Sequence, residues 1–359
     1  MSDTDPIHAG QALRAVDFFC GAGGMSFGLS QAGIQMLGGV DNAVDCKLTY
    51  ESNVPGAKYI RHDITRLSAP ELGRRLNLRK NDPDLIFSGC SPCQFWSKIR
   101  TDKTKSLQTA FLLRQFQRFI KYFRPGFVVV ENVPGLFRRK DNGILVAFLD
   151  FLTSHGYNFK DGIINANNFG VPQNRMRYLL IASRVSTVAP LPVDPGERAL
   201  NVADFIGVPN GFPEIGPGHR DETRFQHSTA ALSEKNVRRI MVTPASGGDR
   251  AAWANDPELQ INAYRGRDKI FRDVYGRMSW DKPAPTITTR FISLSNGRFG
   301  HPQEDRAISV REGAALQTFP KDYEFHSPNL NGLARQIGNA VPPALAKRIG
   351  EHLIAVRNG

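Results

Sequence analysis

Cysteine is scarce in this chain, and long apolar runs are missing from it. Its 359 residues include four cysteines, Cys20, Cys46, Cys90 and Cys93, all in the first third. So few cysteines do not suggest a disulfide framework, and we expect a reduced, intracellular, cytoplasmic protein. No apolar run approaches the length that crosses a bilayer. The first residues also lack the basic flank and apolar core of a signal peptide.

What the chain does have is an excess of positive charge. Its 46 Lys and Arg residues against 34 Asp and Glu residues give a formal net charge of +12. An anionic partner is therefore plausible, and nucleic acid is the commonest such partner. A merely basic, solvated surface explains the same charge, and composition alone does not separate the two. With 41% hydrophobic residues the chain can bury a real core, and its length allows more than one domain.

Short apolar runs punctuate the first half of the chain. They are "AVDFF" (15–19), "DLIFSG" (84–89), "FVVVENV" (127–133) and "RYLLIAS" (177–183). The first three do not alternate and are typical of strands buried on both faces of a parallel sheet, and the last predicts another strand. Between the second and third, apolar residues recur at helical spacing until Pro125. Strands alternating with helices predict an open, doubly wound α/β sheet over roughly residues 12–183.

The texture of the sequence changes after Arg184. From there to about residue 324 it is rich in Pro, Gly and charge, with short β-like pieces such as "PTITTRFISL". We expect a smaller, irregular, β-rich second domain over residues 185–324. The tail is periodic again, and "PPALAKRIGEHLIAV" predicts an amphipathic helix with Pro343 near its start.

A glycine-rich loop follows the first predicted strand. Gly21, Gly23 and Gly24 stand in "FFCGAGGM", directly before a predicted helix. Glycines there let the backbone approach a ligand, although they could also serve a tight turn alone. Asp41 and Asp63 stand at the ends of further short runs, and each by itself could be a solvated loop acid. Together they suggest an adenosine-containing cofactor, and the loop does not spell the GxGxxG of nicotinamide enzymes.

The two cysteines of "GCSPCQ" allow three interpretations. A structural zinc usually needs a second cysteine pair, and the chain has none. A thioredoxin-like redox pair would stand at a helix N-terminus near the start of a smaller fold. The third interpretation is one nucleophilic thiol, Cys93, on a loop, with Cys90 as an apolar residue at a strand end.

Six segments together resemble a known family. In order they are "DFFCGAGGMSFGL", "SPCQFWS", "ENVPGL", "FGVPQNRMRYLLIA", "SVREGAALQTFP" and "QIGNAVPP". Their sequence and order are similar to those of the DNA (cytosine-5)-methyltransferases in their bacterial form. The resemblance covers essentially the whole chain except about residues 185–300. It implies a Rossmann-like methyltransferase domain and makes the thiol of Cys93 a nucleophile.

The resemblance also assigns catalytic roles. Carbon 5 of cytosine is too weakly nucleophilic to attack a methyl sulfonium directly, so Cys93 would first add to carbon 6. Glu131 would hydrogen-bond N3 and the exocyclic amine, although a strand-end acid in a structural ion pair is the plain alternative. Arg177 would lie on the cytosine O2 with Arg175 as support, both pointing one way from a strand start, and Gln94 completes the set. The target base would be flipped out of the duplex.

The methyl donor implied is S-adenosylmethionine, with S-adenosylhomocysteine as product and no metal. By position, Phe19 would stack on the adenine, Asp41 would bind the ribose, and Asp63 the adenine amine. Pro92 and Asn339 would complete the cofactor wall, so the C-terminal helix would return to a catalytic domain made of residues 1–184 and 325–359. The full predicted set is Phe19, Gly21, Ala22, Gly23, Gly24, Asp41, Asn42, Asp63, Ile64, Pro92, Asn339 and Ala340.

In the family the segment before "LQTFP" carries the target-recognition domain. A Thr-centred turn near the flipped base would fall within residues 283–291, which could otherwise be an ordinary strand. The residues predicted to contact DNA are Ser97, Lys98, Arg100, Thr286, Thr288 and Arg290. The loop departs from the family, because Cys90 and Ser91 replace its usual glycine and proline, so loop closure can differ; its basic residues would also suit an ordinary solvated loop.

The leading interpretation is a monomeric, sequence-specific methyltransferase acting on double-stranded DNA in a bacterial nucleoid. It would protect DNA beside a restriction endonuclease or act alone. An RNA methyltransferase on the same scaffold is a second interpretation, but its own signature is absent here. A non-catalytic DNA-binding relative is a third, and the intact Cys93, Glu131 and Arg177 argue against it.

Overall fold

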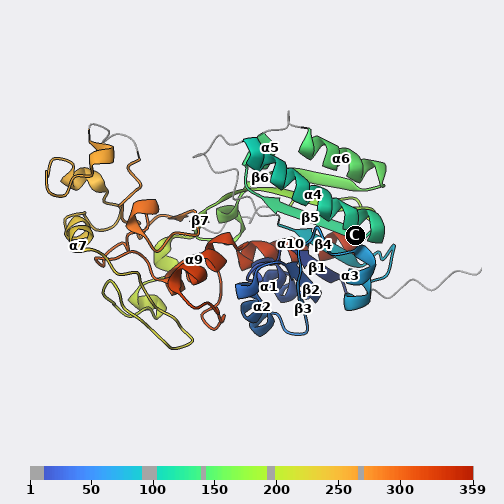
Figure 1. Cartoon of the computed structure of the whole chain (residues 1–359), viewed down its shortest axis with the longest axis horizontal. Coiled ribbons are helices and arrows are strands. Elements are labelled where there is room, and N and C mark those ends of the chain that lie inside the picture. Colours follow the sequence, from blue (N-terminus) through green and yellow to red (C-terminus); the bar gives the residue numbers. More distant parts are fainter. Residues whose placement is uncertain (1–11, 91–102, 139–142, 192–198, 266–270, 359) are drawn as a thin grey trace, which may run out of the picture.

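The computed structural model describes residues 12–90, 103–138, 143–191, 199–265 and 271–358. A sheet covered by helices forms one side of the molecule, and less regular chain forms the other (Figure 1). Within the described residues, no helix is both long and apolar enough to span a bilayer.

The sheet has seven strands in the order β3-β2-β1-β4-β5-β8-β6. Its strands are β1 Arg14–Phe18, β2 Gln35–Asp41, β3 Lys58–Arg61, β4 Leu85–Gly89, β5 Phe127–Asn132, β6 Asn158–Asn165 and β8 Met176–Ser183. The pairs from β3 to β5 are parallel, so the prediction of buried parallel strands is confirmed for the first three apolar runs. The fourth run is a strand too, but β8 is antiparallel to both neighbours, so the sheet is mixed.

Helices cover both faces of this sheet. On one face α3 (Ala69–Leu76), α4 (Lys103–Phe123) and α6 (Ile144–Ser154) contribute to one apolar core. On the other face α1 (Gly24–Gln31), α2 (Lys47–Asn53) and α10 (Pro343–Asn358) contribute to a second core. The doubly wound architecture is therefore confirmed.

Helix α10 packs directly on α1, although more than 300 residues separate them. A Cβ placed on Gly28 would lie 2.3 Å from the carbonyl oxygen of Pro343 and 2.4 Å from the Cβ of Ala346. Only glycine permits this approach of the two helices. The C-terminal helix therefore lies against the element that begins at the glycine loop.

The region 185–324 is irregular. Its described residues form α7 (Glu234–Met241), α8 (Val310–Leu316), short 3₁₀ turns and the two-residue strand β9 (Ala284–Pro285), which pairs with β7 (Gln173–Asn174). The described residues of this region therefore contain less β-structure than the predicted β-rich domain. Pro283 and Pro285 cannot donate backbone hydrogen bonds, so the extended piece that contains them pairs only briefly.

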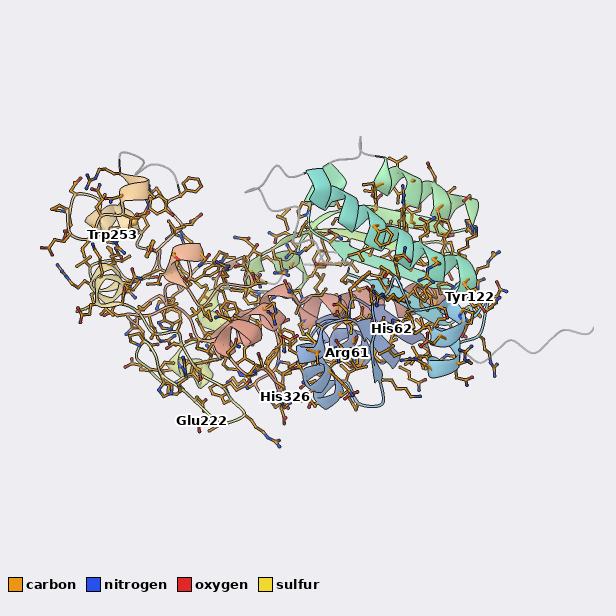
Figure 2. All side chains as sticks on the ribbon, in the orientation of Figure 1. Arg61, His62, Tyr122, Glu222, Trp253 and His326 are labelled. Carbon is orange, nitrogen blue, oxygen red and sulfur yellow. The ribbon has the colours of Figure 1, made fainter. Side chains whose placement is uncertain are left out.

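A third apolar core joins this region to the sheet domain. It combines Ile287, Phe291 and α8 with α9 (Leu330–Asn339), and it reaches Ala22 in the glycine loop. Close by, the loop after α8 also meets α2, where the backbone N–H of His326 donates to the hydroxyl of Thr49 at 2.8 Å (Figure 2). The carboxyl ends of the parallel strands therefore face the irregular region.

Candidate active site

The four central parallel strands end at one edge of the sheet and deliver the predicted site residues there. Strand β1 leads into the glycine loop, β2 ends at Asp41, and β5 carries Glu131. Strand β4 ends at Gly89, and the backbone N–H of Cys90 then donates to the carbonyl of Phe18 at 3.3 Å. Loops at this edge are where open α/β sheets place their ligands.

The glycine loop has a strained backbone. Phe19 has φ 61°, a value uncommon for a residue with a bulky side chain, and Gly21 and Gly23 also have positive φ. The loop is held by the Phe19 N–H, which donates to Val40 at 2.7 Å, and by the Tyr323 hydroxyl, which donates to the carbonyl of Ala22 at 2.5 Å. Strain kept by surrounding contacts is frequent at binding sites.

The loop leaves space beside it for a ligand. A Cβ on Gly21 would meet no heavy atom within 4 Å, whereas one on Gly24 would lie 2.2 Å from the carbonyl of Val341 and 3.2 Å from the Cβ of Ala340. One wall of the loop is thus closed by the predicted residue Ala340, and the side at Gly21 is open. Neighbouring Asn339, at the end of α9, is exposed.

Asp41 is bound into the same loop. Its carboxylate accepts the backbone N–H of Gly21 and that of Ala43, both at 2.9 Å. Burial raises the pKa of Asp41 even though these bonds favour the charged form. A carboxylate has about four acceptor positions, so acceptor capacity remains for a ligand hydroxyl beside the backbone donors.

The second predicted acid lies in a different environment. Asp63 is exposed and accepts the backbone N–H of Thr65 at 2.9 Å, which lowers the pKa of Asp63. Ile64 beside it is buried, and Asn42 is exposed. Open space at Gly21 together with the half-buried acceptor Asp41 fits an adenosine cofactor with ribose hydroxyls.

Glu131 and Arg177 meet at the end of β5. Arg177 Nε lies 3.0 Å from Glu131 Oε1, and the side chains are only 11% and 9% exposed. This is a charge contact, but its N–H is not directed at the oxygen, so Glu131 Oε1 is buried without a hydrogen-bond donor among the described residues. A buried acceptor in that state is costly unless something else binds it.

Arg175 lies just before β8 and joins three segments. Its guanidinium donates to the carbonyls of Ile287 at 3.0 Å and Ala340 at 2.9 Å. Burial lowers the pKa of Arg175 strongly, and nearby Arg177 lowers it further. Strand β8 begins at Met176, so Arg175 lies outside it. The prediction that both arginines point the same way because they alternate along one strand therefore applies to Arg177 only. Arg175 thus links Arg177 to the segment after β9 and to the cofactor wall.

The predicted Thr-centred segment continues from β9. The hydroxyl of Thr286 donates to the carbonyl of Asn174 at 2.7 Å, whereas Thr288 and Arg290 are exposed. Arg290 lines an open polar cavity of about 670 Å³. The other lining residues are Thr289, Ile292, Ser293, Asn296, Asn331 and Arg335.

Six predicted site residues fall in the segment between β4 and α4. Pro92, Cys93, Gln94, Ser97, Lys98 and Arg100 lie outside the described residues. Strand β4, which precedes this segment, ends at Gly89 and lies between β1 and β5.

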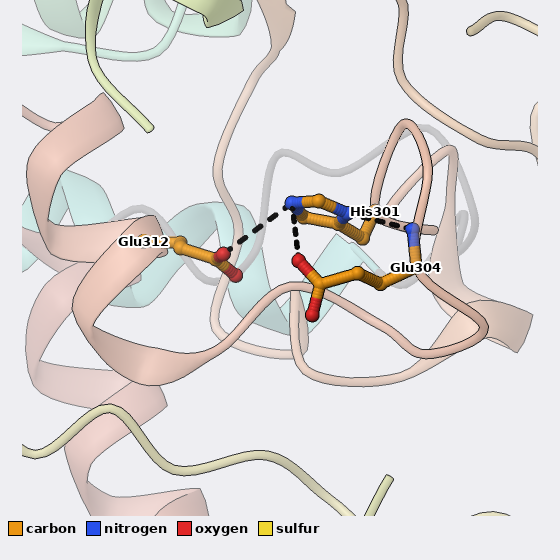
Figure 3. Close-up of side chains that lie close together, drawn as sticks. All are labelled: His301, Glu304 and Glu312. Atoms are coloured by element: carbon orange, nitrogen blue, oxygen red, sulfur yellow. Dashed lines mark hydrogen bonds and ion pairs between the residues drawn. The ribbon is translucent and has the colours of Figure 1, made fainter. Parts of the chain in front are cut away.

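Sequence reasoning missed a second group of buried charges, in the irregular region. Arg306 is fully buried and donates to both carboxylate oxygens of Glu312, at 2.7 and 2.8 Å, and to both of Glu304, each at 2.9 Å. His301 lies with its ring between the two acids, and its Nδ1 accepts the backbone N–H of Glu304 at 2.9 Å (Figure 3). One part of this group could have been predicted from the sequence. Ser309 and Glu312 have the spacing of a helix capping box, and they form one.

We interpret this group as structural. His301, Glu304 and Glu312 offer ligand atoms within 4.8 Å of one another, a spacing that a metal ion could use. However, the guanidinium of Arg306 already donates to all four carboxylate oxygens of the two acids, and its single positive charge offsets one of their two negative charges. Burial alone would raise the pKa of Glu312, but the bonds from Arg306 hold it at about 2, and burial lowers the pKa of His301 to about 4. The histidine is therefore neutral at pH 7.

Comparisons with known proteins agree over the whole chain. The model of the family described as "C-5 cytosine-specific DNA methylase" matches residues 13–355. The Type II methylase M.HgiDII of Herpetosiphon aurantiacus is 36% identical over 94% of this chain and 94% of that protein. The Type II methyltransferase M1.HphI of Haemophilus parahaemolyticus is 32% identical over 96% and 87%. A structure described as a prophage-encoded DNA modification methyltransferase from E. coli covers 97% of this chain and 100% of that one, with a TM-score of 0.74 at 21% identity, a likeness of fold.

Proposed function

This chain belongs to the C-5 cytosine-specific DNA methylase family, and we propose that Cys93, Glu131 and Arg177 carry out its reaction on duplex DNA. The enzyme is a DNA (cytosine-5)-methyltransferase, and the family implies S-adenosylmethionine as its methyl donor. The following roles are proposed for its catalytic and binding residues.

In the proposed reaction Cys93 carries out the first step. Its thiolate adds to carbon 6 of a flipped cytosine, and the electron pair of the 5,6 double bond becomes available at carbon 5. Bound S-adenosylmethionine supplies the methyl group as an electrophile. A base then removes the carbon-5 proton, and the Cys93 thiolate leaves as the double bond re-forms.

Glu131 and Arg177 stabilise the charge that develops on the ring. The observation that carries this assignment is Glu131 Oε1, buried beside Arg177 and without a hydrogen-bond donor among the described residues. The exocyclic amine of the bound base could donate to this carboxylate, and N3 could share a proton held by Glu131 as negative charge develops on the ring. Arg177 would then reach the base O2, while Arg175 keeps the neighbouring segments in place.

The cofactor would lie along the glycine loop. Phe19 would stack on the adenine, and Asp41 would accept the ribose hydroxyls with the acceptor positions left by Gly21 and Ala43. Asp63 would receive the adenine amine, and Pro92 and Asn339 would complete the wall. Open space beside Gly21 supports this placement.

DNA would lie between the sheet edge and the irregular region. We propose that residues 185–324 form a target-recognition domain, with 1–184 and 325–359 as the catalytic domain; the packing of α10 on α1 supports the second part. Thr288 and Arg290 are exposed and offer groups for base edges or phosphates. Protection of DNA from a paired endonuclease, with a monomer as working form, completes the proposal.

The test is bisulfite sequencing of DNA from a methylation-free bacterial host that expresses this chain. We expect protected cytosines within one short recurring sequence, and none when Cys93→Ala is expressed. That variant should stay soluble and bind S-adenosylmethionine as the parent does. Uniform conversion of DNA by the parent chain, with cofactor binding intact, would overturn the proposal, and so would methylation by Cys93→Ala.

A further inference from the structure

Asp17 is an acid in the middle of the first apolar strand, with no part in the proposed reaction. It lies in β1 and is 0% exposed. Its Oδ2 accepts the hydroxyl of Ser26 at 2.8 Å, and its Oδ1 accepts the hydroxyl of Ser88 at 2.8 Å. Both oxygens are therefore bound, each by a different element.

The two serines belong to the two segments that the reaction needs. Ser26 is in the first turn of α1, immediately after the glycine loop. Ser88 is the next-to-last residue of β4, five positions before Cys93. The hydroxyl of Tyr50 in α2 donates to Ser26 at 3.1 Å and extends the network under the loop.

An acid at this place has a cost that plain packing would avoid. Burial raises the pKa of Asp17 to about 7, although the bonds from Ser26 and Ser88 lower it. The charged and titratable groups around it are Asp41 from β2, which raises this pKa further, Cys20 after β1, and Tyr50 from α2. None of the described groups that shift its pKa is a cation. A buried carboxyl without a cationic partner is destabilising. Its presence here therefore points to a role that a neutral side chain could not fill.

We propose that Asp17 is a positioning residue that ties the cofactor loop, through Ser26, to the strand leading into the Cys93 loop, through Ser88. The proposal rests on the function proposed above. When ionised, the Asp17 carboxylate accepts two hydroxyl donors at once on separate oxygens, which an amide or hydroxyl side chain cannot do, so binding and rate are measured above its pKa of about 7. Asp17 thereby fixes the distance between the segment that holds the methyl donor and the segment that holds the nucleophile. Small errors in such a distance cost rate even when both ligands bind.

The test uses the full chain and four variants. Asp17→Asn removes one acceptor, Ser26→Ala cuts the link to the loop, and Ser88→Ala cuts the link to β4. Ser183→Ala is the matched control, because this fully buried serine of β8 pairs with Phe127 at the opposite edge of the sheet. For each variant we would measure the melting temperature, the Kd of S-adenosylmethionine by calorimetry, and the single-turnover methylation rate.

The expected result is a separation of effects. Ser26→Ala should weaken cofactor binding about tenfold, and Ser88→Ala should lower the single-turnover rate about tenfold with binding unchanged, each the scale of one hydrogen bond. Asp17→Asn should do both. Its stability relative to the parent should rise as pH goes from about 4 to about 7, because the native state of the parent holds the Asp17 proton in that window and Asn does not titrate.

Two results would overturn the proposal. One is that Asp17→Asn changes only the melting temperature, as Ser183→Ala would. The other is that all three network variants affect binding and rate alike, in proportion to lost stability. If the parent chain does not methylate DNA, the proposed function fails; the calorimetry of Ser26→Ala and Asp17→Asn still reports on the tie to the loop.

Discussion

Two groups of buried charge lie in different parts of this enzyme, one in the irregular region and one at the sheet edge, and they differ in how completely their carboxylates are hydrogen-bonded. In the irregular region Arg306 binds all four carboxylate oxygens of Glu304 and Glu312. At the sheet edge Arg177 contacts Glu131 through one N–O distance of 3.0 Å, and that oxygen still has no hydrogen-bond donor among the described residues.

The difference separates a structural role from a chemical one. A fully bonded buried group gains nothing from a ligand and holds its surroundings in one arrangement. A buried acceptor without a donor can still bind a substrate, and its desolvation penalty is offset only when the substrate donates to it. By this criterion the contacts of Arg306 with Glu304 and Glu312 are structural, although His301 Nε2 beside them is also buried without a hydrogen-bond partner among the described residues, and Glu131 is left free to bind the base. The predictions below test the contrast, and two of them use the same substitution at both sites.

The largest effect is expected for Glu131→Gln. Gln keeps the shape but cannot supply a proton at N3, so stabilisation of the negative charge that develops on the ring in the transition state should fall. We expect kcat to drop about a thousandfold, in the range seen when one charge-stabilising group is removed. The melting temperature should hardly change, and a large drop in it with normal kcat would reverse the assignment. Steady-state methylation and thermal unfolding on one preparation decide this.

Glu312→Gln is the matched substitution in the Arg306 group. It leaves a buried guanidinium with one charge fewer beside it, which should cost about 3 kcal/mol or more of unfolding free energy. Because Glu312 takes no part in the reaction, kcat of the folded enzyme at low temperature should stay within about twofold of the parent. Urea titration gives the first quantity. Normal stability with lost turnover would contradict the structural role.

Arg177→Lys should have an intermediate effect. Lysine keeps the charge but lacks the planar set of donors that can serve Glu131 and the base together. A fall in kcat/KM of roughly ten- to hundredfold is expected, with cofactor affinity unchanged. Equal losses in cofactor affinity would mean that Arg177 acts on the cofactor side instead.

The smallest effect concerns acid sensitivity. Burial lowers the pKa of His301 to about 4, so the unfolded chain takes up a proton below its ordinary pKa of about 6.5 while the native state does not. His301 should therefore contribute a fall in stability as pH goes from about 6.5 to about 4, opposite in sign to the contribution of Asp17. His301→Asn should flatten this slope, since Asn can accept the N–H of Glu304 without titrating. An unchanged slope would remove His301 as its cause.

Much of the fold was readable because buried strands have an unmistakable composition. The runs of β1, β4 and β5 are continuous and apolar, and α4 repeats its phenylalanines at helical spacing. The strand β6, "NFKDGIIN", is only half-buried and has no such pattern. The antiparallel direction of β8 depends on the connection through β6, which no local signal reveals.

The site divides in the same way. Motifs placed the loop glycines, Asp41 and Glu131 at strand ends because these residues close apolar runs, and they placed Arg177 at the start of the strand that carries the last run. Contacts between residues far apart in the sequence were not predictable, such as that of Arg175 with the carbonyl of Ala340, 165 positions later. The role of Asp17 was hidden too, although an acid inside "AVDFF" was a visible irregularity.

The most direct test of the account is to trap the adduct between Cys93 and the base. In duplex DNA with 5-fluorocytosine at the methylated position, carbon 5 carries fluorine where a proton should leave, so the final elimination is blocked. With S-adenosylmethionine present, we predict a complex that survives denaturation and a peptide with the methylated base attached to Cys93. The same peptide unmodified, or the base on another residue, would contradict the account.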